Sequence, residues 1–183
     1  RFVFVDRLRA DAAATVAALK ARGLTVEILS GDVSSAVEAA ARAVGVAAWR
    51  AGLTPTEKSN AVRDVTAAGR KVLMVGDGLN DAAALAGAHA AMAPGTALDA
   101  SQNAADLVFS GEGLGAVVEA FDVARSARVR ALENFGFAAL YNLVAAPAAM
   151  LGFVNPFVAA LAMSGSSLAV TINALRTGAG RRA

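Results

Sequence analysis

The chain has 183 residues, enough for one hydrophobic core and a small appendage, and its lack of cysteine excludes disulfides, cysteine zinc sites and thiol nucleophiles. It is 56% hydrophobic, with a mean hydropathy of +0.52 that is high for a water-soluble domain. Basic residues outnumber acidic ones by 17 to 15, but six arginines flank the apolar C-terminal region: Arg125, Arg128, Arg130, Arg176, Arg181 and Arg182. Without these six, the rest of the chain is mildly acidic, so no nucleic-acid partner is expected.

Residues 1–120 alternate between short β-like runs and helical stretches, which predicts an α/β fold with a parallel sheet covered by helices. Gly23 and Gly69 end the first and third helices, and Pro55 opens the third. In chain order, we expect a strand at 2–5, a helix at 10–22, a strand at 25–29, a helix at 34–44, a short strand at 46–49, a helix from 55 to about 68, a strand at 71–75 and edge strands at 90–92 and 107–109.

Two short motifs follow the expected strands. In Ser30-Gly31-Asp32, a hydroxyl and a backbone N–H at a strand end can hold phosphoryl oxygens, although Asp32 fits a plain helix cap equally well. After Thr54-Pro55, Lys58 falls in the first turn of a helix, where the helix dipole disfavours a cation. A lysine there either serves a phosphate or is solvated surface.

The string Gly76-Asp77-Gly78-Leu79-Asn80-Asp81 directly follows a strongly apolar strand. Sheets of this class bind ligands at the carboxyl ends of their strands. Two carboxylates four residues apart on a glycine-bent loop suit a hard cation such as Mg²⁺, and glycine lets the backbone approach a phosphate closely. The string therefore predicts a magnesium and phosphate site, against the alternative of an ordinary Asp-Gly turn.

Residues 134–175 contain no charged residue. Because a bilayer core needs about 20 apolar residues per helix, this run predicts two transmembrane helices, at about 134–152 and 156–175, separated by a turn. Arginines lie before the first and after the second, which by the positive-inside rule places both ends in the cytoplasm. The alternative is a buried helical hairpin in a large soluble protein.

Polar residues lie near the middle of both expected spans. Tyr141 and Asn142 fall about 12–14 Å into the first span. Met163, Ser166 and Ser167 share one face of the second span at similar depth. Polar residues at this depth often face a transport path, and a thioether suits Cu(I), although small residues and lone methionines also serve only in helix packing.

Together these strings resemble the heavy-metal (P1B) branch of the P-type ATPases, whose phosphorylation domain belongs to the haloacid-dehalogenase (HAD) group. The motifs occur in family order, and the resemblance covers nearly the whole chain. It implies a HAD-like, Rossmann-like parallel sheet over part of a domain at residues 1–122, then a juxtamembrane helix and a transmembrane α-helical hairpin at 123–183.

The resemblance implies roles for the matching positions. Asp77 would bind Mg²⁺, supported by Asn80 and Asp81. Lys58 would contact phosphoryl oxygens, as would the Ser30-Gly31-Asp32 motif through Ser30 and Gly31. Ala83 stands where many family members have proline, and this departure should shift the local helix start without abolishing metal binding.

The last two spans match the copper-selective members at four positions, with Ser166 beside them: Tyr141, Asn142, Met163 and Ser167. Zinc-type members place an aspartate in the last span, and this chain has no acidic residue there. The strings Met163-Ser164-Gly165-Ser166-Ser167 and Met92-Ala93-Pro94 also resemble those of copper pumps that serve cytochrome oxidase assembly.

The resemblance implies a bacterial plasma-membrane ATPase that uses ATP and Mg²⁺, exports Cu(I) or Ag(I), and keeps its HAD-like domain and C-terminus in the cytoplasm. A copper chaperone is a further partner that the family allows. The chain starts at Arg1, shows no signal peptide and lacks the Asp-Lys-Thr-Gly-Thr string that carries the family's phosphorylated aspartate. We therefore expect a C-terminal piece that needs its missing N-terminal part and does not hydrolyse ATP alone.

Two alternatives belong to other functional classes. A membrane-tethered HAD phosphatase would need its own nucleophile, and Asp6 is followed by Arg7-Leu8-Arg9 instead of the second acid and glycine of such a loop. A non-catalytic membrane subunit would instead assemble with or regulate a complete pump. The upstream coding sequence distinguishes this last possibility from a truncated pump.

Overall fold

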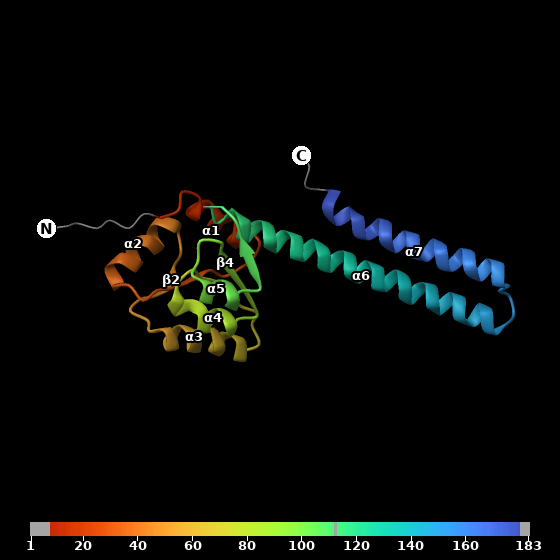
Figure 1. The fold of residues 1–183 in the computed structure, drawn as a ribbon, viewed down its shortest axis with the longest axis horizontal. Helices are drawn as coiled ribbons and strands as arrows, with labels where there is room; N and C mark the ends of the chain where they lie inside the picture. The colour runs from red at the N-terminus through yellow and green to blue at the C-terminus, as the bar shows by residue number, and fades with distance from the viewer. Residues whose placement is uncertain (1–7, 112, 180–183) are drawn as a thin grey trace. The chain divides into compact units, whose positions relative to one another are not determined.

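The computed structural model describes residues 8–111 and 113–179, which divide into two compact units, one up to Glu119 and one from Ala120. The strand expected at 2–5, the candidate nucleophile Asp6, and Arg181 and Arg182 lie outside the described residues. Figure 1 shows the elements coloured along the chain.

The first unit alternates strands and helices in the predicted order. The helices expected at 10–22, 34–44 and 55–68 and the five strands expected after residue 24 are confirmed within a few residues. Its elements are α1 (Ala12–Ala21), β1 (Glu27–Leu29), α2 (Ser34–Val44), β2 (Ala48–Arg50), α3 (Pro55–Ala67), β3 (Leu73–Val75), the short 3-10 helix η1 (Leu79–Asp81), α4 (Ala82–Ala86), β4 (Ala90–Pro94), α5 (Asp99–Ala104) and β5 (Leu107–Phe109).

Every strand pair is parallel, as predicted, but the described strands form two sheets. One sheet pairs β1 with β2, and the other has the order β3-β4-β5. The prediction that residues 90–92 form an edge strand is wrong, because β4 is the central strand of its sheet. Ala91 and Ala93 are almost fully buried there, and their small side chains let α4 and α5 pack closely on β4.

The core of the first unit is built from small and branched apolar side chains contributed by helices and strands. Phe109 is 5% exposed and belongs to this core, whereas Trp49, the only tryptophan, is half-buried in β2. Other buried apolar side chains are Val37, Ala41, Val46, Ala61, Val62, Ala84, Leu85 and Met92.

A capping box fixes the start of α3. The Thr54 Oγ1 accepts from the Glu57 backbone N–H at 3.3 Å, and the Glu57 carboxylate accepts from the Thr54 N–H at 2.8 Å. The backbone and side-chain hydrogen bonds from Thr54 lower the pKa of Glu57. With Pro55 as the first helical residue, this arrangement sets the angle at which Lys58 leaves the first turn.

Asp11 joins the two ends of the first unit. It precedes α1, yet its side chain does not cap that helix. Its Oδ2 instead accepts from the backbone N–H of Gly115 at 2.8 Å, at the first residue of α6 (Gly115–Met150). A Cβ added to Gly113 would lie 2.7 Å from the same oxygen, so the loop before α6 needs glycine at this position.

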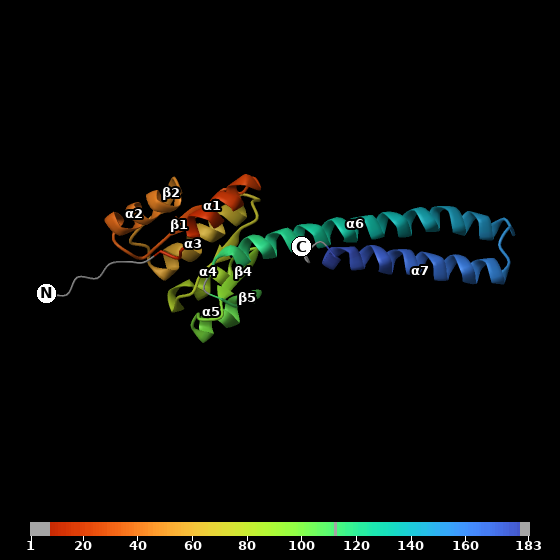
Figure 2. The same ribbon diagram turned by 90° about the horizontal axis from the view of Figure 1, so that it is seen from above.

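The second unit is an antiparallel helical hairpin, formed by α6 and α7 (Pro156–Ala179), which lie side by side in both ribbon views (Figures 1 and 2). Gly152, at φ +76°, reverses the chain between them. Asn155 then caps α7, since its Oδ1 accepts from the Val158 N–H at 2.8 Å.

Apolar side chains cover the outside of this hairpin. Several large ones are more than two-thirds exposed within the unit, among them Phe135, Leu143, Met150, Phe157 and Leu175. Among the described residues, 156–176 form the one helical segment that is long and apolar enough to cross a membrane. The first expected span does not reach the same hydropathy, and the polar residues Asn134, Tyr141 and Asn142 lower it.

Candidate active site

The two glycine-containing motif loops leave their sheets at strand carboxyl ends. The Ser30 N–H donates to the Arg50 carbonyl at 3.0 Å, just beyond β1 and β2. The Gly76 N–H donates to the Met92 carbonyl at 3.2 Å, just beyond the last paired residue of β3. Loops at this edge are the usual ligand-binding positions of parallel sheets.

A cavity of about 530 Å³ lies at these strand ends. It is lined by residues from the loops after β1 and β3 and from the first turn of α3. The structure brings around this one cavity all seven residues predicted for the phosphoryl site, namely Ser30, Gly31, Asp32, Lys58, Asp77, Asn80 and Asp81.

Lys58 and Asp81 form a nearly buried ion pair in this cavity. The Lys58 Nζ donates to Asp81 Oδ1 at 2.8 Å, and the two side chains are only 11% and 13% exposed. The second carboxylate oxygen of Asp81 accepts from the Gly78 N–H at 3.3 Å. The alternative that Lys58 is a solvated surface residue is therefore wrong, because the start of α3 directs it inward onto the loop after β3.

The loop after β1 is held by its own side chains. The Ser30 hydroxyl donates to Asp32 Oδ2 at 2.9 Å, and the Asp32 N–H donates back to the Ser30 Oγ at 3.1 Å. Helix α2 begins at Ser34, with Val33 as its N-cap and no side-chain cap. The alternative that Asp32 is a plain helix cap is therefore wrong, and its carboxylate remains at the cavity.

Helix α5 supports the loop after β3, which the sequence did not predict. The Ser101 hydroxyl, fully buried, donates to the Gly78 carbonyl, and the Leu98 N–H donates to the Asp77 carbonyl at 3.3 Å. Periodicity gave no signal for α5 because the helix has only six residues. Its contacts fix the backbone carbonyls of Asp77 and Gly78, directly after the Asp77 side chain.

The residues present fit a magnesium ion. No side-chain hydrogen bond or ion pair engages the Asp77 carboxylate within the described part of the chain, and Asn80 and Asp81 line the same cavity. The described residues contain no group of three His, Cys, Asp or Glu side chains that could form a complete protein cage. Mg²⁺ needs no such cage, because it commonly uses one or two carboxylates together with waters and substrate phosphates.

Replacing Gly76 with alanine is expected to destabilise the first unit by about 1–3 kcal/mol, the usual cost of overpacking. The added Cβ would lie 2.8 Å from the Asp81 Cβ and would push Asp81 away from Lys58. Urea unfolding of the whole chain in detergent, followed by the fluorescence of Trp49, measures the change.

Gly87→Ala is the matched control, because its Cβ would meet only an ordinary contact, 3.4 Å from the Ala83 carbonyl. Equal stability of the Gly76 and Gly87 variants would contradict the close packing of Gly76 against Asp81.

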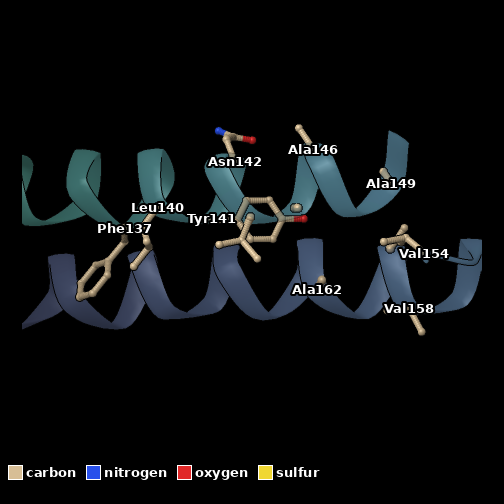
Figure 3. A pocket seen from close by; sticks show the side chains of 12 residues that line it. Phe137, Leu140, Tyr141, Asn142, Ala146, Ala149, Val154, Val158 and Ala162 are labelled. Atoms are coloured by element: carbon tan, nitrogen blue, oxygen red, sulfur yellow. The ribbon is translucent and has the colours of Figure 1, made fainter. Parts of the chain in front are cut away.

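The residues predicted for the transported ion are distributed over two surroundings. Tyr141 and Asn142 line a cavity of about 690 Å³ in the hairpin, where Figure 3 shows the Tyr141 ring between α6 and α7 beside Ala162, and Asn142 on the side of α6 away from α7. The other three residues do not line this cavity: Met163, Ser166 and Ser167. Within the described chain, the five residues thus do not line one common cavity.

The predicted residues of α7 have contacts of their own. The Ser166 hydroxyl donates to the Met163 carbonyl at 2.9 Å, and the Ser167 carbonyl accepts from the Thr171 hydroxyl at 2.9 Å. The Met163 side chain is 67% exposed within the unit. Both of these hydrogen bonds are made within α7.

Comparisons with known proteins agree over nearly the whole chain. Residues 1–89 match the family model of the haloacid dehalogenase-like hydrolases. The nitrogen fixation protein FixI of Bradyrhizobium diazoefficiens is 50% identical over 92% of this chain and 23% of its own length. The probable copper-exporting P-type ATPase V of Mycobacterium tuberculosis is 40% identical over 93% of this chain and 22% of its own length.

A solved structure covers both units. The crystal structure of a zinc-transporting PIB-type ATPase in the E2.Pi state matches 94% of this chain and 28% of its own chain, with a TM-score of 0.89 and 34% sequence identity. The chain spans about a quarter of the length of the curated relatives and of this pump.

Proposed function

Because this chain belongs to the heavy-metal (P1B) branch of the P-type ATPases, we propose that it is part of an ATP-driven pump that exports Cu(I) across a membrane. The first unit would supply part of the phosphoryl-transfer site and the second unit two helices of the ion path. The observation that carries this proposal is the cavity in which Ser30, Lys58 and Asp77 come together at the strand ends.

The chemistry follows from the charges and donors around that cavity. The Lys58 ammonium, already held by Asp81, would draw phosphoryl oxygens to a fixed point. Ser30 and the backbone at Gly31 would donate to the same oxygens from the facing loop. Asp77, with Asn80 in support, would hold Mg²⁺, which when bound neutralises the charge of the transferring phosphoryl group.

The phosphate acceptor must come from elsewhere in the pump. The 183 residues contain no Asp-Lys-Thr-Gly-Thr string, so we expect the phosphorylated aspartate further upstream in the same reading frame. For the 183-residue chain by itself, we expect no ATP hydrolysis above background. In the whole pump, formation and loss of the aspartyl phosphate would shift the spans between two states that expose the ion to opposite sides.

Two observations support copper as the transported ion. The last helix carries a thioether and hydroxyls but no carboxylate between residues 156 and 175. The thioether is a soft ligand that suits Cu(I), and Ag(I) would compete by the same chemistry. One of the relatives is a probable copper-exporting ATPase.

The arginines at both ends of the hairpin support a separate point, the cytoplasmic position of each end.

The copper assignment is tested in the full-length pump by replacing Met163 and Ser167 with alanine together. Loss of the soft donor and its neighbouring hydroxyl should raise the half-saturating Cu(I) concentration for ATPase stimulation about tenfold or more. ATPase rates against free Cu(I), with Zn²⁺ as the competing metal, give the measurement.

Ser164→Ala is the matched control, because it removes one hydroxyl from the same helix at a position outside the predicted set. Unchanged Cu(I) stimulation in the double variant would refute the assignment of these two residues. If Zn²⁺ but not Cu(I) stimulated the ATPase activity of the parent pump, the assignment of copper as the transported ion would be refuted.

A further inference from the structure

A cluster of four polar residues, here called the polar clasp, joins the two helices of the hairpin near its open end: Arg130, Glu133 and Asn134 on α6 and Asn173 on α7. The Asn173 Nδ2 donates to Glu133 Oε2 and to Asn134 Oδ1, both at 3.0 Å. The Arg130 guanidinium donates to both oxygens of Glu133, at 2.8 and 3.1 Å.

Asn173 stands out from the rest of its helix. It is 7% exposed, and among residues 156–176 of α7 it alone is buried. An amide buried between helices is costly unless both of its N–H groups are bonded, and here both are. The side chain of Asn173 therefore favours one alignment of α7 against α6.

The acceptor on α6 is charged at neutral pH. Hydrogen bonds from Arg130 and then from Asn173 lower the pKa of Glu133, and the nearby charges of Arg130 and Arg176 act in the same direction. Charge-assisted hydrogen bonds are stronger and more directional than neutral ones. The clasp is thus suited to hold one position of the helices near neutral pH.

The clasp and the turn fix the hairpin at its two ends. Between them, Tyr141 follows Asn134 by seven residues and Ser166 precedes Asn173 by seven residues. At 1.5 Å rise per residue, each side chain lies about 10 Å from the clasp in the same direction. Tyr141 and Ser166 are therefore at the same level, and Met163 lies one helical turn further along.

We propose that Asn173 is a positioning residue that sets the register of α7 against α6 and thereby holds Tyr141 level with Ser166 and within one turn of Met163. A slip of α7 by a single residue would change the direction of Ser166 and Met163 relative to Tyr141 by about 100° around the helix. The role in copper binding rests on the proposed function, whereas the register itself does not.

The register is tested with a cysteine pair, since the chain has no cysteine of its own. Ala145 on α6 and Ala159 on α7 both line the hairpin cavity that Tyr141 also lines. Both alanines are replaced with cysteine in the 183-residue chain, which is then reconstituted in phosphatidylcholine vesicles. A short thiol-to-thiol crosslinker then joins the two cysteines. The yield of crosslinked product should fall at least about threefold when Asn173→Leu is added, because the clasp no longer opposes sliding of α7 along α6.

Two further variants keep this result interpretable. Thr171→Val removes a hydroxyl that donates to the Ser167 carbonyl within α7, and it should leave the yield unchanged. Asn173→Asp should lower the yield because it places a second carboxylate beside Glu133, and Glu133→Gln added to it should restore the yield by exchanging donor and acceptor. If Asn173→Asp simply misfolded the hairpin, adding Glu133→Gln would not restore the crosslinking yield. Equal yields in the parent, Asn173→Leu and Asn173→Asp chains would overturn the proposal.

The functional consequence is measured in the full-length pump. Asn173→Leu should raise the half-saturating Cu(I) concentration about tenfold while leaving the maximal rate and phosphorylation by inorganic phosphate within about twofold. A purely structural role would lower the maximal rate and the yield of protein instead, and that outcome would overturn the positioning role. A parent pump without Cu(I) stimulation would refute the proposed function, and the crosslinking result would still decide the register.

Discussion

Asp77→Ala in the full-length pump is expected to reduce ATP hydrolysis and aspartyl-phosphate formation by about 10³-fold or more, the range seen when a phosphoryl-transfer site loses a main electrostatic element. The carboxylate of Asp77 lines the cavity and has no other bonding partner in the described part of the chain, so its removal leaves the neighbouring packing intact. Asp77→Asn should be nearly as severe, because an amide keeps the shape and loses the negative charge that holds Mg²⁺.

Phosphorylation with radiolabelled ATP at several Mg²⁺ concentrations measures this effect. Asp64→Asn is the control, since it removes a carboxylate from the exposed face of α3, outside the cavity. Stability should be unchanged in both variants, as judged by Trp49 fluorescence during urea unfolding. If Asp77→Ala kept normal phosphorylation and normal magnesium dependence, the assignment of the cavity as the phosphoryl site would be wrong.

Lys58→Met should both abolish phosphorylation and destabilise the first unit by about 3 kcal/mol, because it leaves the Asp81 carboxylate unpaired in a nearly buried position. The loss of stability is measured on the 183-residue chain by urea unfolding with Trp49 as the reporter, and the loss of phosphorylation on the full-length pump. The thioether side chain keeps most of the volume of the lysine, so packing changes little.

A double variant separates the two consequences. Adding Asp81→Leu to Lys58→Met removes the unpaired charge and should recover at least about half of the lost stability, since a buried ion pair can often be replaced by apolar residues. Phosphorylation should stay abolished. Recovery of phosphorylation together with stability would show that Lys58 acts only by supporting the loop and does not contact the phosphoryl group.

The elements that periodicity describes well were predicted closely. Helix α2 has the expected bounds, 34–44, because its amphipathic pattern and the following Gly45 in the left-handed region define both ends. Helices α4 and α5 were missed because five or six residues are too few to show a period. The central place of β4 was missed because an alanine-rich strand shows no burial pattern until the helices that pack on it are known.

The positions of the site loops followed from one rule, that the carboxyl ends of parallel strands gather at one edge. The rule indicated Ser30 and Asp77 but not the pairing of Lys58 with Asp81, which depends on how α3 lies over the loop after β3. Ser101 gave no signal, because a single serine in a short helix has no distinctive spacing. In the hairpin, the sequence indicated Tyr141 and Met163 but not Asn173, since one asparagine at a helix end has many uses.

The bond between Asp11 and Gly115 spans 104 residues and has a consequence for biosynthesis. Contacts between distant parts of a chain form late, because the closure of a long loop must come first. On the ribosome, Asp11 emerges long before its partner, and the carboxylate stays hydrated until the backbone amide of Gly115 has left the exit tunnel. We therefore expect the first unit to be completed only when the start of α6, which leads into the hairpin, has been synthesised.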